Sequence, residues 1–225
     1  MKNYEGREVN FNKEVVTEIR EKLDEFKKEI MRKRNKKIEI DNEDLFKLLQ
    51  QLYTLGDDLL AEFDEFISCQ KGCSQCCDKL VYITEPEGMM INKFISNNFT
   101  KNEINNIKYK INKRIKLRKD IKTSQNYAKI IESHKKEFSC IFYSQERLCK
   151  IYSVRPWNCR RHIVFSDRET CKLENEKHPI TLNNTPFTGV KQLVDDIENE
   201  IYILNDNYKN ENYYTLQEYM EKINI

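Results

Sequence analysis

Hydrophobic residues recur every three or four positions along much of the chain, a spacing typical of amphipathic helices that bury one face. The first such run extends from residue 12 to about residue 33. The second begins after Asp41, a good N-cap residue, and continues to Phe66. A strand-like run from Leu80 to Ile83 follows and is too short to build a sheet alone. The pattern therefore predicts an N-terminal helical hairpin over residues 1–67.

Three Thr-x-x-Glu motifs predict where later helices begin, because each of the two side chains can bond the backbone N–H at the other's position. They start at Thr84, Thr100 and Thr215. The helix after Thr100 carries isoleucines on one face and mostly Lys and Arg around the other, including Lys110 and Arg114. A solvated polar face explains these cations without a partner.

The helical periodicity is lost between residues 140 and 171, after a last helical pattern at residues 127–134, and returns at residues 190–201. We therefore expect a mainly α protein, with helices packed around an irregular cysteine-rich metal-binding centre. The predicted parts are residues 1–67, residues 68–179 with a helical insertion at about 89–137, and C-terminal helices in residues 180–225.

The cysteines are the candidate chemistry, because four of the eight lie within nine residues that form a Gly-containing turn. Buried cysteines that serve only as small hydrophobic residues would instead follow a helix or strand period. Thiolates two to four residues apart in a turn can reach one ion at about 2.3 Å. We expect all eight to be metal ligands: Cys69, Cys73, Cys76, Cys77, Cys140, Cys149, Cys159 and Cys171.

The neighbours Cys76 and Cys77 bear on the kind of centre, since adjacent side chains diverge and rarely bind one tetrahedral ion together. We expect them to serve two metals, or to have different roles. Eight thiolates would fill two four-ligand zinc sites, or an iron–sulfur cluster with ligands to spare. Both remain open, with a slight preference for iron.

The composition favours metal over disulfides. No apolar run suits a secretory signal or a membrane span, so we expect a cytoplasmic protein whose thiols stay reduced. The formal net charge of +2 gives no reason to expect a membrane partner or a nucleic acid. The expected partners are metal ions, with a protein partner or substrate left open.

Three arginines bracket Cys159 and are placed to offset the negative charge of thiolate sites: Arg155, Arg160 and Arg161. They are the candidate cofactor-binding residues. His134 and His178 are isolated in the sequence, and we expect neither to be a ligand.

The cysteine segments resemble a known family. The run from Cys69 to Cys77, together with Cys-x-Ile-Tyr-x-x-Arg-Pro-x-x-Cys-Arg from Cys149 to Arg160, is similar to the bacterial cysteine-cluster (CxxCxxCC, YkgJ-like) family of zinc- or iron-chelating domains. The resemblance covers about half the chain and implies metal chelation by these cysteines. The first two cysteines have three residues between them, where the family has two.

Other functions fit parts of the pattern. Cys69-x-x-x-Cys73-x-x-Cys76 matches the loop of radical S-adenosylmethionine enzymes, but it follows a long helix and not a barrel strand. A weaker similarity to flagellin lysine-N-methylase, an iron–sulfur protein, keeps open an S-adenosylmethionine-dependent protein methylase. A zinc-ribbon-like module that binds nucleic acid or protein is the third alternative. Whether the protein is an enzyme, and which residues would be catalytic, is left open.

Overall fold

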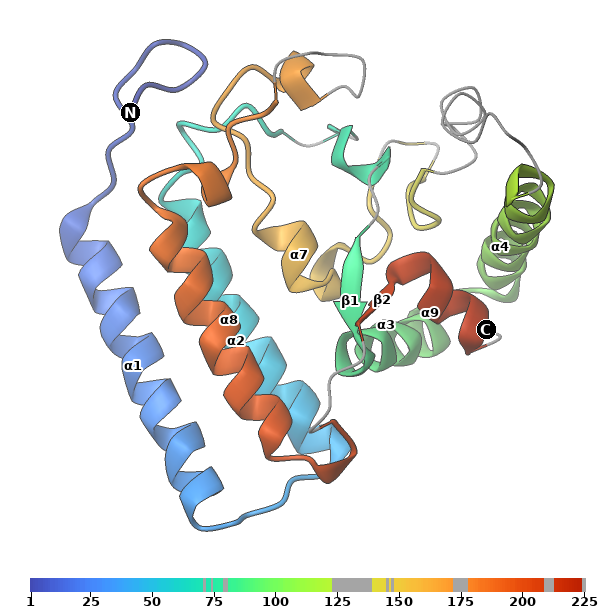
Figure 1. The fold of residues 1–225 in the computed structure, drawn as a ribbon, viewed down its shortest axis with the longest axis horizontal. Helices are drawn as coiled ribbons and strands as arrows, with labels where there is room; N and C mark the ends of the chain where they lie inside the picture. Colours follow the sequence, from blue (N-terminus) through green and yellow to red (C-terminus); the bar gives the residue numbers. More distant parts are fainter. Residues whose placement is uncertain are drawn as a thin grey trace. The chain divides into compact units, whose positions relative to one another are not determined.

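The computed structural model describes residues 1–70, 72–73, 75–78, 81–122, 139–144, 146, 148–171, 178–208 and 213–223, and of residues 78, 117–122 and 190 only the backbone. The described chain is mainly helical, which confirms the predicted fold class in that respect (Figure 1). The predicted helical pattern at residues 127–134, with His134, lies outside the described residues. None of the described helices has the length and apolar character that a membrane span requires.

The chain divides into two compact units, each built from two separate stretches. The three-helix unit contains Met1–Cys69 and Trp157–Asn212, and the strand unit contains Gln70–Pro156 and Tyr213–Ile225. This division differs from the predicted one, because the C-terminal part is split between the two units. The eight cysteines are split between them as well.

The three-helix unit is built on α1 (Lys13–Asn35), α2 (Asn42–Ala61) and α8 (Thr188–Ile203), which lie side by side (Figure 1). The first two helices were predicted, and the Asp41 carboxylate accepts a hydrogen bond from the Asp44 N–H at 2.9 Å, as expected of an N-cap. Helix α2 ends before the predicted Phe66, which lies in the turns that follow. The core contains fully buried apolar side chains of α2 and α8: Leu45, Leu49, Leu52, Leu59, Val194, Ile197 and Ile201.

A short helix, α7 (Trp157–Arg160), is fixed to α2 and α8 by its tryptophan. The Trp157 ring stacks on Tyr53 with 6.1 Å between centroids, and its indole N–H donates to Asp195 Oδ1 at 2.8 Å. Gly56 makes room for the ring, since a Cβ there would lie 2.8 Å from Trp157 Cζ3. Because α7 carries Cys159, this contact fixes one of the candidate ligands. The rest of the unit includes the 3₁₀ turns η3 (Arg168–Cys171), η4 (Leu182–Asn184) and η5 (Asp206–Tyr208).

The strand unit contains β1 (Tyr82–Thr84) and β2 (Tyr213–Thr215), which pair antiparallel with Ile83 opposite Tyr214. Each strand leads directly into a helix, β1 into α3 (Glu85–Asn98) and β2 into α9 (Leu216–Lys222). Both junctions are the predicted capping boxes. A third helix, α4 (Lys101–Lys122), and two 3₁₀ turns, η1 (Gln75–Asp78) and η2 (Tyr152–Val154), complete the described elements of the unit.

Candidate metal centre

The first cysteine segment of the strand unit is a tight turn. Gly72 has φ +86°, a left-handed conformation that favours glycine, and the Cys73 N–H donates to the Gln70 carbonyl at 2.9 Å. The turn leads into η1, which carries Cys76 and Cys77 next to each other. The predicted Gly-containing turn is therefore present.

The second segment is a hairpin that returns to the first. The Cys140 N–H donates to the Cys77 carbonyl at 2.7 Å, which joins two residues more than 60 positions apart in the chain. Tyr143 and Cys149 then form an antiparallel bridge, and the Lys150 N–H donates to the Phe142 carbonyl at 3.0 Å. Cys140 and Cys149 thus come from the two arms of one hairpin.

Four thiols of the strand unit act on one another electrostatically. A hydrogen bond with the Cys76 thiol, burial, and the charges of Cys76, Cys140 and Cys149 raise the pKa of Cys77 far above its ordinary value. Burial raises the pKa of Cys140 to about 11, with further contributions from the charges of Cys149 and Cys76. Burial and the charge of Cys76 raise the pKa of Cys149. Every pair among these four is therefore linked, and Cys77, Cys140 and Cys149 hold their protons more tightly than ordinary thiols unless a cation replaces them.

Positive side chains act on two of the four thiols, Cys140 and Cys149. The charge of Arg155 lowers the pKa of Cys149, and the charge of Arg114 lowers that of Cys140. Burial and the charge of Arg114 lower the pKa of Lys110, whereas the charge of a Cys140 thiolate raises it. Arg155 was a predicted cofactor-binding residue, and its guanidinium also lies over the Tyr152 ring, 4.1 Å from the centroid. Lys110 and Arg114 are cations that the sequence reasoning missed.

Arg114 corrects the expectation of a solvated cationic face, because only 4% of its surface is exposed. Its position explains this, since it lies seven residues after the buried Ile107 and therefore on the same face of α4. Lys110 lies on this face too, and its ammonium donates to the Ile141 and Tyr143 carbonyls at 3.1 and 3.2 Å. The spacing of Lys110 and Arg114 from Ile107 was therefore the signal in the sequence for a shared face of the helix.

Glu103 begins this face of α4 and ties it to the residue after Cys149. Its carboxylate accepts a hydrogen bond from Lys150 Nζ at 2.9 Å. It also accepts from the Thr100 N–H and Oγ1, both at 2.9 Å, in the capping box predicted at Thr100. The bond with Lys150 contributes most, and the bonds with Thr100 next, to lowering the pKa of Glu103 from 4.5 to about 2. A lowered pKa means that ionised Glu103 stabilises the fold above pH 4.5, and that this stabilisation is lost as the pH falls toward 2.

We expect the variant Glu103→Gln to be less stable than the wild type near pH 7, with a difference that narrows as the pH falls from 4.5 toward 2. The free energy of unfolding, from urea titrations followed by circular dichroism at several pH values, checks this. Glu25→Gln, at an exposed position of α1, is the control that changes charge without removing these bonds. A Glu103→Gln difference that stays constant with pH would contradict the assignment.

The other predicted ligands lie outside this group. Cys73 is in the turn before η1, whereas Cys69, Cys159 and Cys171 belong to the three-helix unit, where Cys171 is buried and the other two are partly buried. There the Ser68 N–H donates to the Val164 carbonyl at 2.8 Å, so Cys69 lies beside the segment that follows Cys159. Each unit thus holds a subset of the eight cysteines.

Two of the three predicted arginines have carboxylate or amide partners in the three-helix unit. Arg160, 8% exposed, forms an ion pair with Asp57, and its guanidinium lies 5.3 Å from the Tyr53 ring centroid. Arg161 Nε donates to Asn158 Oδ1 at 2.9 Å. These contacts hold the two arginines against their own unit, so a role beside thiolates stays a prediction. His178 is exposed.

None of the eight cysteines, all of which lie within the described residues, forms a disulfide. Within the described part of the chain, no group of three or more Cys, His, Asp or Glu side chains is arranged to hold a metal ion. The four linked thiols therefore supply suitable donor atoms, but not a finished set of ligands. No family model, curated protein or solved structure matches the chain. The cysteine-cluster resemblance thus rests on its motifs alone, and the geometry of the strand unit has to support any proposal about function.

Proposed function

We propose that the strand unit holds a metal through the thiolates of four cysteines: Cys76, Cys77, Cys140 and Cys149. The observation that carries the proposal is the linkage of all four thiols, which come from two segments joined by the bond between Cys140 and Cys77. A thiolate in such a group makes ionisation of the thiols next to it more costly unless a cation is present. A bound metal replaces their protons and turns this mutual repulsion into attraction to a shared charge.

The surrounding cations support the same proposal. Four thiolates leave a net negative centre around either zinc or an iron–sulfur core. Arg114 and Arg155 would offset that charge, and their N–H groups are the kind of donor that bonds to metal-bound sulfur. Arg114 is nearly inaccessible to water, so the neighbouring thiolates would also lower the cost of its burial.

We favour an iron–sulfur cluster over zinc because of the neighbours Cys76 and Cys77. The side chains of adjacent residues point in different directions. A cluster offers a separate iron to each of the two thiolates, whereas one zinc ion would need both to converge on a single point. Loading would require the η1 turn and the hairpin to close on the metal, because the described side chains are not yet arranged as ligands.

The metal content tests the proposal. Protein purified without oxygen is expected to be brown and to contain iron with acid-labile sulfide, whereas colourless protein with stoichiometric zinc would select the zinc alternative. Serine replacement of each of the four cysteines in turn should remove most of the metal. Cys171→Ser, in the other unit, is the matched control and should keep it.

Two results would overturn the proposal. One is wild-type protein that takes up neither iron with sulfide nor zinc under reducing conditions. The other is metal that is lost from the Cys69, Cys159 and Cys171 variants while the four strand-unit variants retain it, since the ligands would then belong to the three-helix unit.

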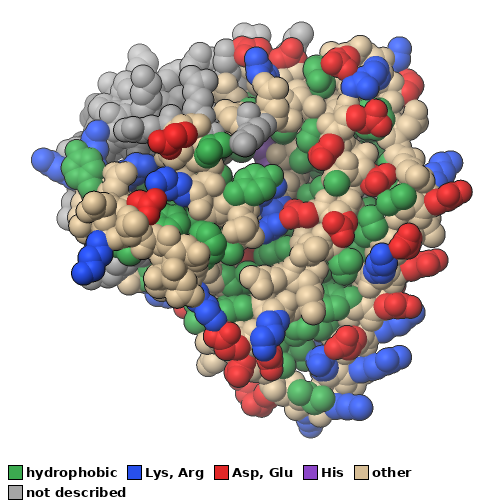
Figure 2. Space-filling view, turned by 180° about the vertical axis from the view of Figure 1, so that it is seen from behind, with side chains coloured by type: hydrophobic (Ala, Val, Ile, Leu, Met, Phe, Trp, Pro, Cys, Tyr) green, Lys and Arg blue, Asp and Glu red, His purple; other side chains and the backbone are tan. Residues whose placement is uncertain are grey.

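The predicted alternatives remain to be tested. Heat release or cofactor cleavage on titrating S-adenosylmethionine into the metal-loaded protein would support the methylase-like alternative. For a nucleic-acid module the surface offers little support, because Figure 2 shows Lys and Arg side chains interspersed with Asp and Glu side chains on the face in view. Such mixed charge favours neither phosphate backbones nor strongly acidic partners.

A further inference from the structure

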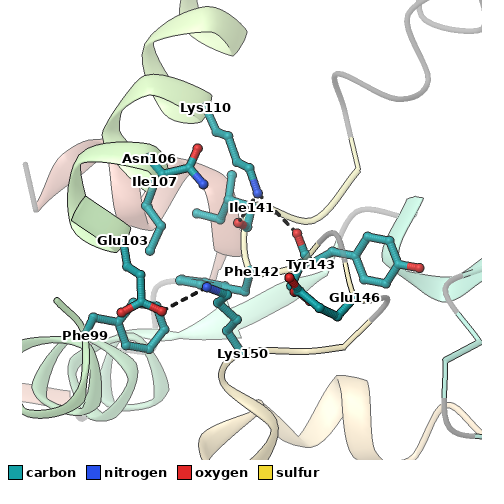
Figure 3. Close-up of a pocket in the computed structure, with 11 residues that line it drawn as sticks. Phe99, Glu103, Asn106, Ile107, Lys110, Ile141, Phe142, Tyr143, Glu146 and Lys150 are labelled. Carbon is teal, nitrogen blue, oxygen red and sulfur yellow. Dashed lines mark hydrogen bonds and ion pairs between the residues drawn. The ribbon is translucent and has the colours of Figure 1, made fainter. Parts of the chain in front are cut away.

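A cavity of about 350 Å³ lies in the strand unit, between α4 and the hairpin that carries Cys140 and Cys149 (Figure 3). Its walls include the apolar side chains of Phe99, Ile107 and Phe142, of which the last two are buried. Its size is at the low end of the range for small-molecule sites. The apolar walls therefore suit a compact body about the size of one ring.

The charged groups of the lining are not equivalent. The Glu103 carboxylate already accepts three hydrogen bonds, one of them from Lys150. Glu146 is hydrogen-bonded to Ser144, which lowers the pKa of its carboxyl. Both lining carboxylates and Lys150 thus have polar partners inside the protein, so none of them calls for a charged ligand.

Lys110 differs, because its two described hydrogen bonds both go to neutral backbone carbonyls. These bonds hold its ammonium at the cavity, as Figure 3 shows, and an ammonium has three N–H donors. In the described part of the strand unit, no ion pair joins Lys110 to a carboxylate. The Lys110 ammonium therefore places one positive charge and one further N–H donor beside the apolar walls of the cavity.

We propose that this cavity binds a small monocarboxylate with an apolar, ring-sized body, its carboxylate on Lys110 and its body against Phe99 and Phe142. A carboxylate supplies the acceptor and the negative charge that the ammonium lacks. The apolar walls partly shield this contact from water, which strengthens it. One ammonium matches a monoanion better than a phosphate, which needs several donors. The site does not depend on a bound metal.

The test compares three probes of the same shape: 3-phenylpropionate, its neutral amide, and the cation 3-phenylpropylamine. Isothermal titration calorimetry on the full chain should give binding of the acid that is about tenfold or more tighter than that of the amide, which corresponds to about 1.4 kcal/mol for a charge-assisted bond. The amine should bind more weakly than either. Equal affinity for acid and amide, or no binding of the acid at millimolar concentration, would overturn the proposal.

Two variants locate the site. Lys110→Met keeps the length of the side chain and removes its charge, so the preference for acid over amide should disappear, whereas Lys108→Met, at an exposed position of α4, should retain it. Because Lys110 also holds two carbonyls, Asn106→Trp provides a second route, filling the cavity from an exposed lining position. Unchanged binding of the acid to either folded variant, Lys110→Met or Asn106→Trp, would place the site elsewhere and overturn the assignment.

Discussion

Replacing Trp157 by alanine is expected to lower the free energy of unfolding of the three-helix unit by about 3–5 kcal/mol, the range for deleting a large buried aromatic side chain. The ring is 2% exposed, stacks on Tyr53 and occupies the space that Gly56 leaves open. Deleting it leaves a cavity between α2 and α8 that these helices cannot fill. Urea unfolding followed by circular dichroism measures the loss.

Trp157→Phe separates packing from hydrogen bonding. Phenylalanine keeps an aromatic ring against Tyr53 but loses the indole N–H that bonds Asp195, and Asp195 retains Lys191 at 2.6 Å. We expect this variant to lose about 1 kcal/mol, the usual net contribution of one hydrogen bond, together with part of the packing. An alanine variant as stable as the wild type would mean that the ring does not contribute to this core.

Gly88→Ala is expected to destabilise the strand unit by about 1–3 kcal/mol, the cost of overpacking a well-packed core. A Cβ on Gly88 would lie 2.4–2.6 Å from three ring atoms of Tyr219, closer than carbon atoms can approach. Tyr219 is itself 2% exposed and has little room to move away. The same unfolding measurement checks this change.

Gly189→Ala is the matched control, since a Cβ at that helical glycine meets nothing within 4 Å. It should be neutral or stabilise the protein by up to about 1 kcal/mol, because alanine favours helix. Combining Gly88→Ala with Tyr219→Leu should cost less than the sum of the two single changes, since the leucine removes the obstructing ring. Strictly additive losses would contradict a direct clash.

The helix starts in the strand unit could be predicted because their signals are local. Each capping box at Thr84, Thr100 and Thr215 is complete within four residues, and all three form the expected bonds. The pairing of β1 with β2 was not predicted. The run from Leu80 to Ile83 was recognised as strand-like and overlaps β1, but the three residues of β2 show too little alternation to be recognised. The paired residues also lie some 130 positions apart. The shared pattern Tyr-x-Thr-x-x-Glu at Tyr82 and Tyr213 was the available clue.

The candidate site was predictable in its residue types but not in its grouping. The sequence pointed to all eight cysteines, but their division between two units depends on long-range contacts such as the one from Cys140 to Cys77. Lys110 and Arg114 were expected to face solvent because a run rich in Lys and Arg obscures their spacings from Ile107, three residues for Lys110 and seven for Arg114. Arg160 was expected beside thiolates, and no sequence pattern could have shown Asp57 as its partner.

The pairing of β1 with β2 also constrains the order in which the protein can form during synthesis. The strand unit lacks its second strand and α9 until residues 213–222 have left the ribosome. The three-helix unit likewise waits for α8, which packs on both α1 and α2. Neither unit can close its core early, so the growing chain exposes its apolar faces and its thiols until α8 and α9 have been synthesised.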